Sequence, residues 1–254
     1  PVIKGEIEFD HVYFEYEEGK PVLEDISFKI EKGQTVAILG ATGSGKSSLV
    51  NLLLRLYDCT KGSIRIDGVD IKNINKKWLR KNVGIILQEP FLFSRTIKEN
   101  ITIAKRDADE NEIIAASKAA SVHNTILSFE KGYDTMVGER GVTLSGGQRQ
   151  RLAIARTIIR DIPILVFDDS LSAVDMETDA AIRKALKERR KDVTTIIISH
   201  RITTLSEADK IFVLEGGKIS MSGTHDDLIA CEGLYKRVWE IQNSLESEMG
   251  ELIS

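Results

Sequence analysis

The segment GATGSGKS, residues 40–47, has the residue types and the spacing of a loop that binds phosphate groups. It fits the pattern G-x-x-x-x-G-K-[ST], and it lies between an apolar run and a helical pattern, as that pattern requires. Gly43 and Gly45 let the backbone bend so that successive N–H groups face one anion, and a helix N-terminus adds a favourable dipole. Lys46 supplies a charge for the β- and γ-phosphates, and the Ser47 hydroxyl can ligate Mg²⁺. The segment therefore predicts a nucleoside triphosphate site rather than an ordinary glycine–serine turn.

Two adjacent carboxylates, Asp168 and Asp169, stand at the end of the apolar run ILVFDD. A carboxylate at a strand end beside a phosphate loop can hold, from the opposite side, the Mg²⁺ that Ser47 holds. Asp168 is predicted to do this, although an aspartate that caps the following turn is the alternative. Asp169 would then point to the place where an attacking water sits.

The segment LSGGQRQRLAIARTIIR contains a second set of residues suited to a phosphate group. Ser145 is the predicted N-cap of a long helix, and Gly146 and Gly147 remove side chains where a backbone would approach an anion closely. The sequence has one lysine-containing phosphate loop, and that loop already has its own helix. A second prepared helix N-terminus suggests a ligand shared between two copies, whereas an ordinary serine–glycine cap is the alternative.

The elements that must position these residues follow from the spacing of apolar residues. GEIEFDHVYFEY and GSIRIDGVDI alternate apolar and polar residues, which predicts antiparallel strands. TVAILG, VGIILQ, PILVFDD and TTIIISH are short continuous apolar runs, typical of strands buried on both faces of a mostly parallel sheet. Helical patterns follow the first run and separate the last two.

The stretch 88–160 differs, because it has helical patterns and no convincing buried strand. We therefore predict an α/β fold in which residues 1–87 and 161–254 form a nucleotide-binding core with an antiparallel β lobe. Residues 88–160 are predicted to form an inserted α-helical subdomain. Residues 226–245 are predicted to form one amphipathic helix that packs on the core.

Composition limits the classes of function. The 254 residues are 42% hydrophobic and 29% charged, and the net charge of −4 gives no electrostatic reason to expect a nucleic-acid partner. Cys59 and Cys231 form neither a disulfide framework nor a metal motif, which favours a reducing compartment. The sequence has no apolar run of membrane-spanning length and no signal peptide. Its first residue is not Met, so we expect a processed chain or a domain of a longer polypeptide.

Six segments, in the order GATGSGKSS, LQEP, LSGGQ, ILVFDD, SAVD and IISHR, together resemble the nucleotide-binding domain of an ABC transporter. The resemblance covers almost the whole chain and implies a P-loop NTPase (RecA-like) core that binds ATP and Mg²⁺. It also implies a head-to-tail dimer with a second nucleotide-binding domain. In such a dimer, ATP lies between the phosphate loop of one domain and the LSGGQ segment of the other.

The resemblance implies roles for further residues. Tyr16 resembles the aromatic residue that stacks on adenine, although a packed aromatic on a strand is the alternative. Gln88 resembles the residue that links Mg²⁺ and the attacking water to the helical subdomain and the membrane domain. His200 resembles the switch histidine that contacts the γ-phosphate and the attacking water. Ser172 and Asp175 resemble a loop that crosses the dimer axis, and a helix cap at Asp175 is an equally good local account.

The resemblance thus gives a catalytic set of Asp169, His200 and Gln88 and a magnesium set of Ser47, Gln88 and Asp168. The ATP-binding residues that it implies are Tyr16, Gly40, Thr42, Gly43, Ser44, Gly45, Lys46, Ser47 and Ser48. The residues that would bind the ATP of the opposite domain are Ser145, Gly146, Gly147 and Gln148.

The segments FLFSRTIKENI and YDTMVGERGVTLSGGQ resemble exporter-type domains. In exporters, the segment around Glu139 and Arg140 lies near the coupling helices of the membrane domain. The resemblance therefore implies transmembrane domains of the same polypeptide as partners, and a location at the cytoplasmic face of the cell membrane. Two alternatives are a soluble ABC ATPase that acts on DNA, ribosomes or iron–sulfur assembly, and a regulatory half that binds ATP but scarcely hydrolyses it.

The family usually has glutamate at the position of Asp169. Aspartate is one methylene shorter, so its carboxylate falls about 1.5 Å short if the backbone does not move. A misplacement of about 1 Å can lower a rate roughly a hundredfold. We therefore expect slow hydrolysis at this site, as in one half of a heterodimeric multidrug exporter. A homodimer is the alternative.

Overall fold

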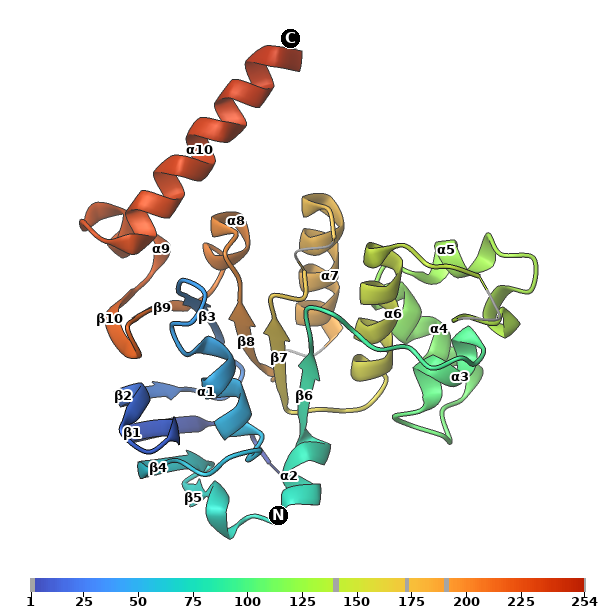
Figure 1. Ribbon diagram of the computed structural model, residues 1–254. Helices are drawn as coiled ribbons and strands as arrows, with labels where there is room; N and C mark the ends of the chain where they lie inside the picture. The colour runs from blue at the N-terminus through green and yellow to red at the C-terminus, as the bar shows by residue number, and fades with distance from the viewer. Residues whose placement is uncertain (1–2, 139–141, 172–173, 190–191, 254) are drawn as a thin grey trace. The chain divides into compact units, whose positions relative to one another are not determined.

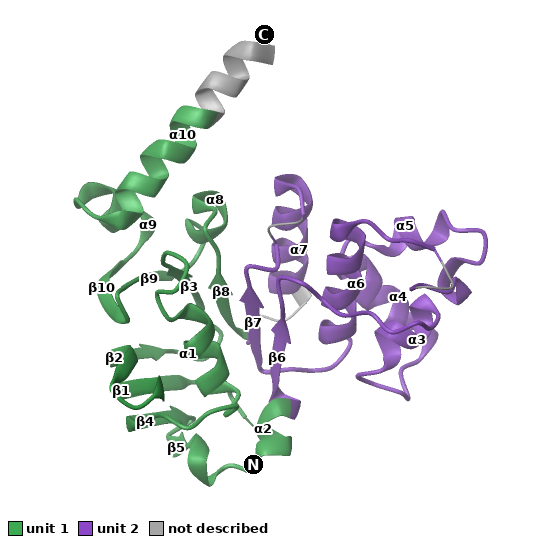
Figure 2. Cartoon of the chain, viewed as in Figure 1, with its two compact units in different colours: residues 1–80, 194–254 green, residues 81–193 purple. Residues whose placement is uncertain are grey.

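The computed structural model describes residues 3–138, 142–171, 174–189 and 192–253. The chain divides into two compact units, the first made of residues 1–80 and 194–254 and the second of residues 81–193 (Figure 2). Figure 1 labels the elements of both units. In the described ranges, no helix is both long and apolar enough to cross a membrane.

The first unit contains the predicted antiparallel sheet. Its strand order is β2-β1-β4-β5, and its strands are β1 (Ile7–Glu17), β2 (Lys20–Ile30), β4 (Lys61–Ile66) and β5 (Val69–Asp70). The two alternating segments of the sequence pair with each other in β1 and β4, where Ile7 lies opposite Ile66. The prediction of antiparallel strands from alternation is therefore confirmed.

An irregularity at His11 changes which side chains of β1 face the core. His11 has a φ of 47°, and the pairing with β2 shifts between Phe9 and Val12. Buried side chains alternate up to Phe9 and then again from Val12 to Phe14, so the buried phase moves by one residue. The shift brings Val12 and Phe14 to the buried face that Ile7 and Phe9 occupy.

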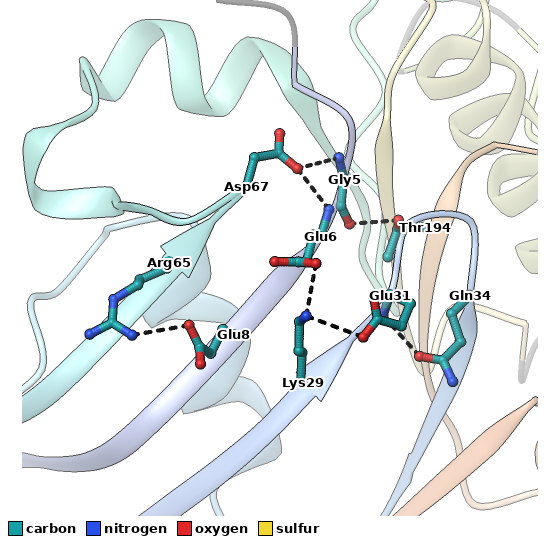
Figure 3. Close-up of polar contacts among 9 residues, drawn as sticks. All are labelled: Gly5, Glu6, Glu8, Lys29, Glu31, Gln34, Arg65, Asp67 and Thr194. Atoms are coloured by element: carbon teal, nitrogen blue, oxygen red, sulfur yellow. Dashed lines mark hydrogen bonds and ion pairs between the residues drawn. The ribbon is translucent and has the colours of Figure 1, made fainter.

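Polar contacts tie the segment before β1 to both sheets of this unit (Figure 3). The Asp67 carboxylate accepts the N–H groups of Gly5 at 3.1 Å and Glu6 at 3.0 Å. The buried hydroxyl of Thr194 donates to the Gly5 carbonyl oxygen at 2.6 Å. Thr194 is the first residue of β8 (Thr194–Ile198), so the chain that leads into β1 is fixed at the start of a buried strand.

The second sheet of the first unit contains two of the predicted buried strands, β3 (Thr35–Leu39) and β8. Strand β3 pairs in parallel with β8, where Ile38 lies opposite Ile198, and in parallel with β9 (Lys210–Glu215) on its other side. Strand β10 (Lys218–Gly223) pairs antiparallel with β9. The carboxyl ends of β3 and β8 therefore lie side by side, at the kind of edge where α/β sheets bind ligands.

The helices of the first unit are α1 (Lys46–Leu53), η1 (Ile71–Asn73), α8 (Ile202–Leu205), α9 (His225–Ala230) and α10 (Leu234–Ile253). Helix α2 (Lys76–Asn82) crosses the boundary between the two residue ranges. The prediction of a single helix over residues 226–245 is wrong, because two helices share this stretch. Cys231 has an extended backbone and ends α9, and a methyl group at Gly233 would stand 2.3 Å from Met221 Sδ.

The second unit contains the other two predicted buried strands, β6 (Val83–Ile86) and β7 (Ile164–Asp168), which pair in parallel. Its helices are α3 (Ile97–Thr102), α4 (Glu110–Ala119), α5 (His123–Leu127), η2 (Gly132–Asp134), α6 (Gly146–Ile158) and α7 (Met176–Arg189). The described residues between 88 and 160 contain isolated bridges but no strand, as expected from the sequence. The compact unit extends beyond these limits because β6 and β7 pair, and the division at residues 88 and 160 stays a prediction.

Candidate functional site

The predicted phosphate loop joins β3 to α1 within the first unit. Gly43 and Gly45 have φ values of 81° and 104°, in the left-handed region that favours glycine. Gly45 is the N-cap of α1, so the backbone turns from the loop directly into the helix. The first N–H groups of a helix have no partner within it, and they attract anions.

Close packing leaves no room for side chains at two of the loop glycines. A methyl group at Gly40 would stand 2.5 Å from the Leu214 carbonyl oxygen, and one at Gly45 would stand 2.5 Å from Leu23 Cδ2. The Ser44 hydroxyl is buried and has no hydrogen-bond partner among the described residues. Because a buried hydroxyl without a partner is costly, the loop fits a ligand that supplies an acceptor, as a phosphate group does.

The Lys46 side chain folds over this loop. Its Nζ donates to the carbonyl oxygens of Gly40 at 2.6 Å and Ala41 at 2.8 Å. These bonds hold the positive charge at the loop backbone. Thr42 and Ser47 are exposed at the same loop, which leaves the Ser47 hydroxyl accessible to a metal ion.

Tyr16 contacts the helix that follows the phosphate loop. Its hydroxyl lies 3.1 Å from Ser48 Oγ and 3.4 Å from Asn51 Nδ2. Its ring packs edge-on against the rings of Phe14 and Tyr57, at centroid distances of 4.6 and 5.0 Å. The residue is nevertheless 50% exposed. The sequence analysis did not predict that Tyr57 packs on Tyr16, although Tyr57 is an aromatic residue shortly after the phosphate-loop helix.

His200 follows β8 at the sheet edge from which the phosphate loop leaves. Ile198 of β8 lies opposite Ile38 of β3 in the parallel pair. His200 comes two residues after Ile198, and Gly40 comes two residues after Ile38, so both leave the sheet at the same level. His200 is exposed. The first unit thus brings together the phosphate loop, Tyr16 and the segment of His200.

The two adjacent aspartates lie at the end of β7 in the second unit. Asp168 is the last residue of the strand, and Asp169 directly after it has a φ of 48°. This left-handed conformation is uncommon for residues other than glycine, and aspartate is one of the few that adopt it readily. Asp169 Oδ1 is shielded from solvent. The catalytic and metal-binding roles of the pair stay predictions.

Gln88 is exposed in the segment that follows β6. The carbonyl oxygen of the preceding Leu87 accepts a hydrogen bond of 2.9 Å from Nε2 of Gln150, a fully buried residue of α6. The segment of Gln88 is therefore bonded to the helix that begins in LSGGQ. The sequence reasoning missed Gln150, because one polar residue within QRQR gives no sign that it is buried.

Ser145 is the N-cap of α6, as predicted. Its Oγ accepts the N–H of Gln148 at 3.2 Å, and Gln148 Oε1 accepts the N–H of Ser145 at 2.9 Å, which makes a capping box. Ser145 and Gly146 are exposed. The cap is an accessible helix N-terminus with small residues, while its role toward a second chain stays a prediction.

Asp175 caps α7, which confirms the local account of this residue. Its Oδ1 accepts the N–H of Thr178 at 2.8 Å, and this hydrogen bond holds the pKa of Asp175 below its usual value. The role of Asp175 at a dimer axis stays a prediction. Ser172, Glu139 and Arg140 lie outside the described residues.

A pair of aromatic side chains is held at the surface of the second unit. Phe91 is 69% exposed and Phe93 39%, and their rings meet edge-on at 5.0 Å. The buried Asn100 side chain accepts the N–H of Phe93 at 2.8 Å and donates to its carbonyl oxygen at 2.9 Å. Arg156 donates to the Phe91 carbonyl oxygen at 2.8 Å. The backbone is thus fixed beneath apolar side chains that face solvent, as at surfaces that dock a partner.

Comparisons with a family model, with known sequences and with solved structures all find ABC transporters or export proteins. Residues 23–172 match the family model described as ABC transporter. The chain is 49% identical over 242 residues to the “Putative multidrug export ATP-binding/permease protein YgaD” of Bacillus subtilis (strain 168). It is 48% identical over 241 residues to a protein of the same description from Staphylococcus aureus (strain NCTC 8325 / PS 47). A solved structure, “Structure of a bacterial Atm1-family ABC exporter with ATP bound”, matches with a TM-score of 0.91 and 40% identity.

The matches cover nearly all of this chain but less than half of each matched protein. They include 95% and 94% of this chain but 42% of each of the two relatives. The structural match includes 96% of this chain and 43% of the solved chain. The chain therefore spans less than half the length of the proteins that it matches.

Proposed function

The chain belongs to the ABC transporter family, whose ATP-binding domains are ATPases, and on that premise we propose that it is the ATP-hydrolysing motor of an exporter. Its fold is that of a P-loop NTPase with an antiparallel β lobe and a helical part. In the proposal, two such domains close head-to-tail around ATP and reopen after hydrolysis. Membrane domains coupled to them move the substrate.

The observation that supports this proposal most is the loop between β3 and α1. It combines Lys46 held at the loop backbone, a buried Ser44 hydroxyl that needs a partner, and glycines where no side chain fits. Tyr16 adds an exposed aromatic ring at the same helix. We assign the loop and Lys46 to the phosphates of ATP and Tyr16 to its adenine.

Mg²⁺ would be held by Ser47, Gln88 and Asp168, whose hydroxyl, amide and carboxylate oxygens are the donor types that Mg²⁺ prefers. When bound, the ion would neutralise charge on the β- and γ-phosphate oxygens. In hydrolysis, a water attacks the γ-phosphorus, the bond from phosphorus to the bridging oxygen breaks, and ADP leaves with that oxygen. The released phosphate carries the oxygen and the protons of the water. Asp169 accepts a hydrogen bond from the attacking water, and His200 holds the γ-phosphate.

Stacking on adenine gives a first test. Tyr16→Ala should weaken ATP binding by about 1–2 kcal/mol, roughly five- to thirtyfold in Kd, because the base loses its aromatic partner. Tyr16→Phe keeps the ring and loses only the hydroxyl contacts with Ser48 Oγ and Asn51 Nδ2, so its Kd should stay within about threefold of the parent. Calorimetric titration of the chain with ATP measures both. Equal affinity in Tyr16→Ala and the parent would remove Tyr16 from the site.

The second domain of the dimer would complete each ATP site through Ser145, Gly146, Gly147 and Gln148. Support comes from the accessible capping box at the start of α6, whose small residues let a phosphate approach the helix N-terminus. The alternatives of a heterodimer and a homodimer predict the same contacts. The solved relative with ATP bound has the same domain fold.

Ser145→Arg tests this shared site. With ATP and without hydrolysis, the parent chain should associate, and the variant should associate at least about tenfold more weakly, since arginine fills the space of the opposing γ-phosphate. Ser145→Ala removes the capping hydroxyl without adding bulk or charge, so it should lower thermal stability in the same way but keep most of the association. The exposed Ser128 of the same unit gives the control Ser128→Arg. Sedimentation velocity with and without ATP measures association, and identical behaviour of Ser145→Arg and the parent would contradict the shared site.

The proposed exporter also needs a surface through which this domain contacts its membrane domains. Both relatives are described as ATP-binding/permease proteins, and this chain spans 42% of their length. We assign the exposed pair Phe91 and Phe93 to the contact with transmembrane domains of the same polypeptide, at the cytoplasmic face of the cell membrane. The fixed backbone beneath this pair, held by Asn100, supports a preformed docking surface.

A further inference from the structure

Gln242 of the C-terminal helix α10 bonds to the backbone of the segment after β8. Its Nε2 donates to the His200 carbonyl oxygen at 2.6 Å, and its Oε1 accepts the N–H of Ile202 at 2.9 Å. One amide therefore uses its donor and its acceptor on two backbone groups that lie two residues apart. This geometry fixes the backbone on both sides of Arg201.

Apolar packing holds Gln242 in place. Tyr235, Val238 and Trp239 precede it at positions that share one face of a helix with it. Tyr235 is fully buried, and the three side chains pack on a cluster that includes Ile202. The remaining buried members of the cluster are Ala37, Leu39, Leu205, Ala208, Ile211, Val213 and Leu228. The amide is thus presented by a helix that packs on the same core as β3 and α8, as the predicted C-terminal helix was expected to do.

Helix α8 depends on such a contact. It has four residues, Ile202–Leu205, too few to be stable by themselves. Its N-cap residue is Arg201, and a guanidinium group has no acceptor for the N–H groups of a first helical turn. Gln242 supplies an acceptor for the first of them, the N–H of Ile202.

We propose that Gln242 is a positioning residue for ATP hydrolysis, which sets the place of His200 by bonding to its carbonyl oxygen. The inference rests on the proposed function, in which the His200 side chain contacts the γ-phosphate. Because a misplacement of about 1 Å can lower a rate roughly a hundredfold, loss of one of the anchors of this segment should slow turnover while nucleotide binding persists. The end of the chain thereby takes part in catalysis without contact with ATP.

The test compares variants of Gln242 in two backgrounds. Gln242→Met keeps the length of the side chain and removes both hydrogen bonds, and Gln242→Glu keeps an acceptor for Ile202 but removes the donor to His200. In the parent background both should lower kcat for ATP about three- to tenfold, with KM within about twofold. Ile241→Ala, on the exposed side of the same helix, should change neither quantity. Thermal melts of each variant separate misfolding from slow turnover, and in Gln242→Met the amide of Ile202 should exchange its hydrogen faster.

The second background, His200→Ala, separates a positioning role from a general effect on packing. If Gln242 acts through His200, then Gln242→Met should cause no further loss of kcat once the imidazole is gone. An equal further loss in that background, or unchanged kcat in the parent background, would overturn the inference. Those results would leave the proposed ATPase standing. If His200→Ala itself keeps full turnover, the role of His200 in the proposed function fails, and the role of Gln242 fails with it.

Discussion

Lys46→Ala should weaken the binding of ATP about ten- to a hundredfold. A charge-assisted hydrogen bond contributes about 1.5–3 kcal/mol, and Lys46 is the side-chain cation that the phosphate loop itself supplies. Its Nζ already lies at the loop, bonded to the Gly40 and Ala41 carbonyl oxygens, so little side-chain entropy is lost when a phosphate group arrives. Calorimetric titration of the chain with ATP and Mg²⁺ measures the change in Kd.

Two further variants show whether the effect belongs to this site. Lys72→Ala removes the same charge from an exposed position elsewhere in the first unit, so it reports the general electrostatic part. Lys46→Arg keeps the charge but replaces a compact ammonium group by a planar fork, and it should recover only part of the affinity. An unchanged Kd in Lys46→Ala would show that the loop between β3 and α1 is not where ATP binds.

The sequence predicted the phosphate loop well because all of its determinants are contiguous. A buried strand, glycines that adopt positive φ, and a helix start follow one another within one short stretch, and the structure has each of them in place. The same holds for the N-cap at Ser145 and the cap at Asp175, each of which bonds to an N–H three residues later. Local chemistry of this kind needs no knowledge of the rest of the fold.

Features that depend on distant parts of the chain were not predictable in the same way. Gln150 and Gln242 are polar residues within helical patterns, where a solvent-facing position is the simple expectation, yet each bonds to a backbone segment at least 40 residues away in sequence. The bulge at His11 is only partly predictable. The sequence shows the apolar pattern changing phase between Phe9 and Val12, but it does not show the cause of the change.

In the proposed function, Asp169 is the residue whose side chain bears most directly on the rate of hydrolysis. The structure places it in a left-handed backbone conformation directly after β7, which aspartate adopts more readily than glutamate. A change to glutamate should therefore cost up to about 1 kcal/mol of folding free energy at this position. That cost concerns stability alone, so thermal unfolding and turnover must be measured on the same variants.

Asp169→Glu should raise the turnover of ATP roughly tenfold or more, with little change in ATP affinity. The longer side chain brings its carboxylate about 1.5 Å closer to the attacking water, which improves positioning in the transition state and leaves ground-state binding unaltered. Asp169→Asn should remove most of the remaining turnover if the carboxylate orients the water. Asp168→Asn should instead alter the dependence on Mg²⁺ concentration, because in the proposed function that carboxylate holds the metal. Steady-state phosphate release at saturating ATP and Mg²⁺, on the chain paired with itself or with its natural partner, measures all three. Should Asp169→Glu leave turnover unchanged or lower it, the aspartate is already well placed or does not limit the rate, and the ATP site is not a weakened one.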